Sequence, residues 1–71
     1  MSRQLTPRYA TILSMIAQGY DNATSGAHVG CSVRMVDRAA HALAKRFHLD
    51  PERNRRVQLA LYWRDHIATN R

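Results

Sequence analysis

The sequence is poor in acidic residues: five of its 71 residues are Asp or Glu, against eleven Lys and Arg, for a formal net charge of +6. That imbalance favours an anionic partner, and nucleic acid is the commonest one. Cys31 is the only cysteine, so no intramolecular disulfide can form and a reducing cytosol fits. Residues 1–5 are polar and no long apolar run follows them. We therefore expect a cytoplasmic protein with no signal peptide and no membrane partner.

The patterns that carry enzyme chemistry are missing as well. The four histidines (His28, His41, His48 and His66) include no pair three or four residues apart, which is the spacing of metal ligands on a helix. The chain has no Gly-rich phosphate loop, no paired carboxylates at a fixed separation and no base next to Cys31. Cys31 is expected to be a buried, inert thiol. We expect no enzyme, no metal site and no cofactor.

What the chain does have is a strongly amphipathic stretch, which predicts a helix over residues 32–47. Its apolar stripe recurs at helical spacing and comprises Val36, Ala40, Leu43 and Phe47. Its basic stripe lies about half a turn away and comprises Arg34, Arg38, His41 and Lys45. Ser32 is a suitable N-cap, and Gly30 suits a tight turn before it. A short helix, this turn and a basic helix outline a helix-turn-helix; a solvated helix in a small bundle is the alternative.

The remaining residues predict three more helices in one small domain, after a flexible arm at residues 1–4. The first spans residues 6–18, with Thr6 as N-cap, Pro7 as the first helical residue and Gly19 as the stop. The second spans residues 22–29, capped by Asp21 or Asn22. Its Thr-Ser-Gly segment forms helix poorly, so either Gly26 permits close packing or the segment is frayed.

The fourth predicted helix spans residues 51–67, because the sequence at 50–52, Asp-Pro-Glu, supplies a cap, a first-position proline and an acid. It is apolar on two sides and so needs two surfaces to pack against. One side carries Val57, Ala60 and Leu61. For the other we predict a homodimer interface formed by Leu59, Tyr62, Trp63 and His66. Packing of Trp63 in the monomer's own core is the alternative.

Several short motifs within residues 5–49 can be compared with known families. They are Leu-Thr-Pro-Arg at 5–8, Ile-Leu at 12–13, Ala-Gln-Gly at 17–19, Asn22, Val-Gly at 29–30, Ser32, Val36, Leu43, Lys-Arg at 45–46 and Leu49. With this spacing and four helices, the chain resembles the DNA-binding domain of LuxR/GerE-type transcription regulators, in a standalone form. The resemblance covers residues 5–49 without a gap and extends loosely through the fourth helix. It implies an all-α fold, a four-helix LuxR-type helix-turn-helix related to winged helices but without a sheet.

The chain departs from the family pattern at several positions. Tyr9 stands where the family has Glu, Ser25 where it has a core Ile, and Ala39 where it has His. Met35 and Asp37 replace the Thr and Lys of the third helix. Three roles for Asp37 stay open: it accepts a hydrogen bond from cytosine N4, it is repelled by phosphate, or it pairs with Arg34 or His41.

The resemblance implies sequence-specific binding of duplex DNA and regulation of transcription, with the third helix in the major groove. The residues expected to face bases or nearby phosphates are Arg34, Asp37, Arg38 and His41. Those expected to hold the DNA backbone are Lys45, Arg46, Arg8, Arg53, Arg55 and Arg56, although the last three also suit a solvated basic run. Such a protein would associate with the nucleoid in a bacterial cytoplasm.

A second hypothesis is a protein-binding regulator that keeps the fold but has lost specific DNA binding. It would act as an anti-activator or co-activator on a larger transcription regulator or on RNA polymerase. The loss of Lys at Asp37 and the apolar face near Trp63 motivate this alternative.

Overall fold

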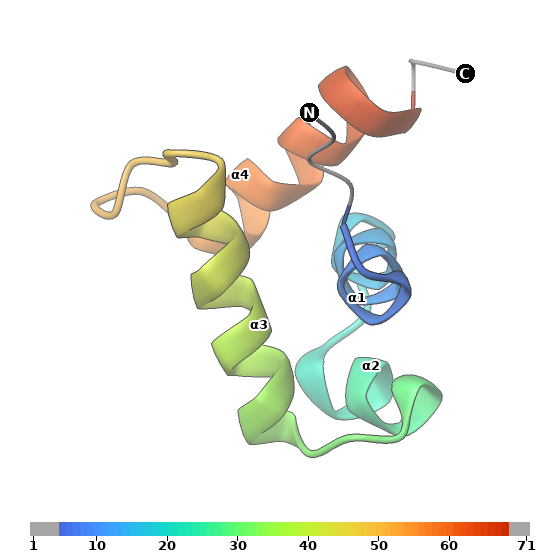
Figure 1. The fold of residues 1–71 in the computed structure, drawn as a ribbon. Helices are drawn as coiled ribbons and strands as arrows, with labels where there is room; N and C mark the ends of the chain where they lie inside the picture. The colour runs from blue at the N-terminus through green and yellow to red at the C-terminus, as the bar shows by residue number, and fades with distance from the viewer. Residues whose placement is uncertain (1–4, 69–71) are drawn as a thin grey trace.

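The structure is a computed structural model that describes residues 5–68, and these fold into four α-helices and a terminal π-helical segment (Figure 1). The α-helices are α1 (Pro7–Ala17), α2 (Asn22–Val29), α3 (Val33–Arg46) and α4 (Arg55–Tyr62), and the π-helix is η1 (Trp63–Ala68). The described residues contain no strand, which confirms the predicted all-α class. The arm predicted at residues 1–4 lies outside the described residues.

Each α-helix begins at a side chain that accepts a hydrogen bond from the first turn. Thr6 Oγ1 accepts from the backbone N–H of Tyr9 at 3.2 Å. Asp21 Oδ1 accepts from the backbone N–H of Thr24 at 2.7 Å, so Asp21 rather than Asn22 caps α2. The caps of α3 and α4 are Ser32 (3.2 Å) and Asn54 (3.0 Å). The sequence thus predicted three of the four caps.

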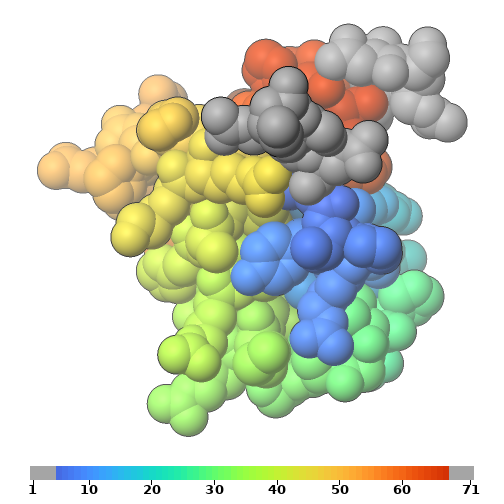
Figure 2. Space-filling view, in the orientation of Figure 1, coloured from blue at the N-terminus to red at the C-terminus, as the bar shows by residue number. Residues whose placement is uncertain are grey.

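The core lies between α1, α3 and α4. Its buried side chains are Ile12, Leu13, Ile16, Val36, Ala39, Ala40, Leu43 and Leu59. The apolar stripe predicted for α3 is therefore confirmed, with Phe47 half-buried at its end. Figure 2 shows side chains of α1, in blue, packed directly beside those of α3, in yellow-green. Because α3 is buried along one side only, its opposite side remains exposed to carry charge.

The predicted start of the fourth helix at residue 51 is wrong, since α4 begins at Arg55. Asp50 instead forms a turn: its Oδ1 accepts from the backbone N–H of Glu52 at 2.9 Å, and its carbonyl accepts from Arg53 N–H at 3.2 Å. Gln58 holds this turn, accepting from Asp50 N–H at 3.0 Å and donating to the Asp50 carbonyl at 2.8 Å. Asn54 then caps the helix, so residues 47–54 form a loop beside α3 that is exposed except for the half-buried Phe47 and Leu49.

Candidate nucleic-acid interface

The connection between α2 and α3 is a three-residue turn closed onto α2 by backbone hydrogen bonds. The carbonyl of Gly26 accepts from the N–H groups of Gly30 (2.7 Å) and Cys31 (2.8 Å). Gly30 has φ +87°, a left-handed conformation that glycine adopts without steric cost. A Cβ atom at Gly26 would lie 2.6 Å from the Cys31 carbonyl oxygen. Gly26 therefore permits close packing, and α2 is a complete helix between two caps.

The outer side of α3 carries the side chains that the sequence predicts to face DNA. Those of Arg34, Asp37, Arg38, His41, Lys45 and Arg46 are all exposed. Val33, in the first turn of α3, is 51% exposed and stands four residues before Asp37. The sequence analysis did not single out Val33 as an exposed apolar residue of α3, although its position outside the buried stripe was a usable signal. An apolar side chain in this place suits contact with a thymine methyl group.

On the α1 side, Arg8 lies beside the basic face of α3. Arg8 and Arg38 line the same shallow cavity of about 300 Å³, together with Tyr9, Cys31 and Met35. Cys31 is half-buried there rather than fully buried as expected. The cavity places one arginine from α1 and one from α3 on a common surface.

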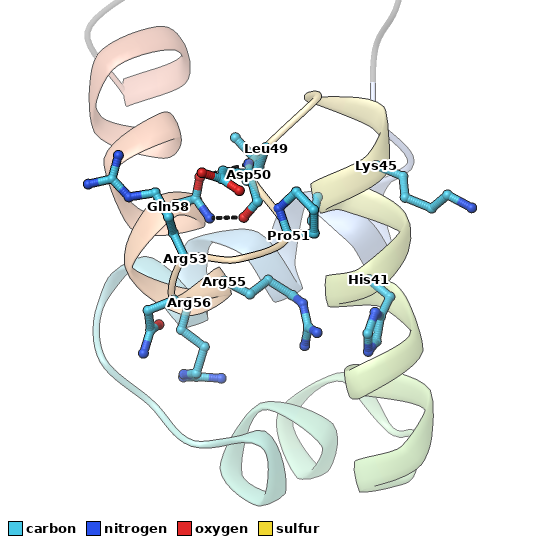
Figure 3. A pocket seen from close by; sticks show the side chains of 11 residues that line it. His41, Lys45, Leu49, Asp50, Pro51, Arg53, Arg55, Arg56 and Gln58 are labelled. Carbon is cyan, nitrogen blue, oxygen red and sulfur yellow. Dashed lines mark hydrogen bonds between the residues drawn. The ribbon is translucent and has the colours of Figure 1, made fainter.

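On the α4 side, a cleft of about 750 Å³ separates α3 from the 47–54 loop and the first turn of α4 (Figure 3). His41 and Lys45 line it from α3, and three arginines line it from the other side: Arg53, Arg55 and Arg56. Figure 3 shows Arg55 extended towards His41, whereas Arg53 and Lys45 point away from the cleft. The predicted basic residues of α3 and α4 are thus brought together, but their side chains do not converge on one point.

Asp37 is ion-paired across this cleft. Its carboxylate oxygens lie 3.7 Å from His41 Nε2, a contact that is ionic only when the imidazole is protonated, and 3.8 Å from Arg55 Nη1. The Asp37 side chain remains 52% exposed. Of the three roles left open by the sequence, pairing with His41 is the one the structure contains, and Arg55 is a second partner that helical spacing does not predict.

Arg56 makes hydrogen bonds within the domain, although it also lines the cleft. Arg56 Nη1 donates to Asn22 Oδ1 at 2.7 Å, and Nη2 donates to the Tyr20 carbonyl. These bonds join the start of α4 to the connection between α1 and α2. Arg56 therefore helps to pack the helices, and its contact with the DNA backbone stays a prediction.

The residues predicted to form the dimer interface make contacts within the domain itself. Leu59 is 0% exposed in the domain's own core and so is not available to a second subunit. Trp63 packs against the same core, while Tyr62 stacks on Phe47 with ring centroids 3.8 Å apart. The His66 ring lies 4.4 Å from that of Tyr62.

The exposed apolar side of α4 is instead formed by Val57 (55% exposed) and Leu61 (43% exposed). A groove of about 460 Å³ runs beside them, with Leu49, Tyr62 and His66 among its lining residues. Its other lining residues are polar or charged: Arg53, Asn54, Gln58 and Asp65. This apolar surface lies on a different side of α4 from Leu59, which the sequence predicted to lie in the dimer interface.

Among residues 5–68, no three His, Cys, Asp or Glu side chains lie close enough together to hold a metal ion. None of the helices in this part of the chain has the length and hydropathy needed to cross a bilayer. Comparison with family models, curated proteins and solved structures gives no match to this chain. What the structure establishes is a small, compact all-α domain of four α-helices.

Proposed function

We propose that this domain binds duplex DNA sequence-specifically through α3 and regulates transcription, as a LuxR/GerE-type helix-turn-helix. The observation that carries the proposal is the α2–turn–α3 unit, in which one side of α3 is buried and the other is exposed and basic. Basic residues of α1 and α4 flank that side, as major-groove binding requires.

The dimensions of α3 suit the proposed mode of binding. Its 14 residues make a rod of about 21 Å, and the major groove, about 12 Å wide, admits one α-helix. Arg34 and Arg38, in the first two turns, would contact guanine edges by two parallel hydrogen bonds or hold nearby phosphates. Arg8 and Lys45 stand towards opposite ends of this surface and would contact the DNA backbone.

We propose that the domain acts as a homodimer through α4, with Val57 and Leu61 joining Tyr62 and His66 at the interface. The support is the two exposed apolar side chains, Val57 and Leu61, beside the groove along this helix, because a small domain gains stability by covering such a surface. Two copies related by a two-fold axis would read two half-sites about 10 base pairs apart.

Selection from a pool of random duplex DNA, followed by sequencing, tests this proposal. We expect an enriched motif with two-fold symmetry. Titrating the selected site at several salt concentrations should then give a linear plot of log K against log salt, with a slope of about −0.9 per phosphate contacted. A pool that shows no enrichment after repeated rounds would contradict sequence-specific binding.

The second candidate is the protein-binding regulator, which the exposed Val57 and Leu61 favour. In that case the groove along α4 would receive a larger transcription regulator or RNA polymerase rather than a second copy. Sedimentation of the isolated chain separates the two cases: a stable dimer favours the DNA-binding homodimer. A monomer that selects no DNA motif and co-sediments with purified polymerase favours the alternative.

A further inference from the structure

We propose that Asp37 is an intramolecular competitor of DNA phosphate for Arg55, and so limits binding of the domain to DNA of arbitrary sequence. The inference rests on the proposed function in one respect: the competing anion is taken to be the phosphate of duplex DNA.

The position of Asp37 gives it this role. It is the only acidic residue in α3, and it stands in the exposed row with Arg34, Arg38 and His41. A carboxylate in the middle of a surface that approaches phosphates lowers the local positive potential where non-specific attraction would be strongest. The negative charge of Asp37 therefore weakens binding that depends on contacts with the DNA backbone alone.

The geometry of the pair makes the competition direct. Arg55 reaches from the first turn of α4 across the cleft towards α3, where its Nη1 lies 3.8 Å from an Asp37 oxygen. This separation is too long for a hydrogen bond, so the pair is held by charge alone. Both side chains are partly exposed, at 36% and 52%, so water and salt screen the attraction. A phosphate oxygen that donors of Arg55 reach at hydrogen-bonding distance can therefore replace the carboxylate.

The neighbouring Arg56 differs from Arg55 because it makes hydrogen bonds within the domain. Its guanidinium donates to Asn22 at 2.7 Å and to the Tyr20 carbonyl, so both of its terminal nitrogens are engaged within the domain. Arg55 instead makes the long contact with Asp37, and it lines the open cleft. Of these two adjacent arginines, Arg55 is the one that can exchange its partner.

The experiment measures binding of the whole chain to a fluorescein-labelled, random-sequence 20-base-pair duplex by anisotropy, between about 20 and 200 mM salt. The variants are Asp37→Asn, Arg55→Gln and the two combined. Glu52→Gln is the matched control, because it removes the same charge from an exposed position in the 47–54 loop. Thermal melts by circular dichroism verify that each variant is folded.

We expect Asp37→Asn to tighten binding to the random duplex about three- to tenfold more than Glu52→Gln does, and to steepen the salt slope by about 0.9, the value for one additional phosphate. In the Arg55→Gln background, the effect of Asp37→Asn should fall well below its effect in the wild type. The inference is overturned if Asp37→Asn matches Glu52→Gln, which would reflect net charge alone. It is also overturned if the effect is the same with and without Arg55, which would reflect the local potential of the carboxylate without any exchange of the Arg55 partner.

The outcomes separate this inference from the proposed function. At the lowest salt, a chain of net charge +6 is expected to bind any duplex, so the comparison does not need a cognate site. A persisting Asp37 effect without an enriched motif would refute sequence-specific binding and support the competition. An enriched motif with no Asp37 effect would do the reverse, and absence of all binding would refute both.

Discussion

Ser25 is a polar residue at a fully buried position. It lies 0% exposed in α2, and among the described side chains its hydroxyl is buried without a hydrogen-bond partner. An unsatisfied buried hydroxyl costs roughly 1–3 kcal/mol, and alanine is also the better helix former. We expect Ser25→Ala to raise the free energy of unfolding by about 1 kcal/mol, and urea unfolding followed by circular dichroism measures it.

A matched variant separates the hydroxyl from helix propensity. Ala27 is exposed on the same helix, so Ala27→Ser should cost only the propensity difference, about 0.5 kcal/mol. If Ser25→Ala destabilised the domain by more than this, the hydroxyl would have to be satisfied in solution, for example by a buried water.

Asp21 gives the stability of the domain a dependence on pH. Hydrogen bonds from the backbone N–H and the hydroxyl of Thr24, with a smaller attraction from Arg56, hold the pKa of Asp21 below its ordinary value of 3.8. The folded state therefore favours the carboxylate, and this contribution is complete above the unfolded pKa and lost as the pH falls through the lower folded pKa. Asp21→Asn keeps a good N-cap but cannot titrate. We expect its free energy of unfolding to fall less steeply below pH 3.8 than that of the wild type, and parallel curves from pH 7 to pH 2 would contradict the assignment.

At the scale of the element, the α2–turn–α3 unit depends on the absence of a side chain at Gly26. Helix propensity alone predicts that Gly26→Ala stabilises α2 by about 1 kcal/mol. The new Cβ would, however, lie 2.6 Å from the Cys31 carbonyl oxygen, which is backbone and must move. Because overpacking of this kind costs about 1–3 kcal/mol, we expect a net destabilisation of about 1 kcal/mol and a displaced α3.

The direction in which Gly26→Ala shifts the thermal midpoint of unfolding tests this expectation. Ala23→Gly, at an exposed position of the same helix, should lower the midpoint through propensity alone. A Gly26→Ala variant that melts above the wild type would show that the turn relaxes without cost.

The helices themselves were largely predictable from the sequence, because their signals are local. The spacing of Val36, Ala40 and Leu43 assigned the buried side of α3 correctly, and Ser32 is the cap that the pattern indicated. The start of α4 was not predictable in the same way. Asp50 carries the features of a helix cap, yet it makes a turn because Asn54 supplies a second cap and Gln58, eight residues away, holds the Asp50 backbone.

At the scale of the whole molecule, the contacts that arrange the candidate interface join residues far apart in the sequence. Asp37 meets Arg55, and Arg56 meets Tyr20 and Asn22, across separations that no helical period encodes. The sequence therefore identified the basic residues of the candidate site but not which of them are engaged inside the domain. It also misassigned Leu59, because two apolar stripes on one helix do not reveal which of them faces the core.

Substitution of Arg56 tests whether an arginine of the candidate site stabilises the domain through its contacts within it. Arg56→Gln removes hydrogen bonds that tie α4 to the connection between α1 and α2, and bonds from a charged group contribute about 1.5–3 kcal/mol each. Since this site is only partly buried, we expect the free energy of unfolding to fall by about 1–2 kcal/mol. Arg53→Gln removes the same charge from an exposed side chain and should change it by less than about 0.5 kcal/mol.

DNA binding by the folded Arg56→Gln variant is the second measurement. Because Asn22 and Tyr20 hold the Arg56 guanidinium, we expect it to neutralise no phosphate, so the salt slope of Arg56→Gln should equal that of the wild type. Arg56→Lys should recover little of the lost stability, since an ammonium group lacks the planar fork that reaches both acceptors. A variant with unchanged stability and a salt slope reduced by about 0.9 would contradict the internal role and place Arg56 on the DNA backbone.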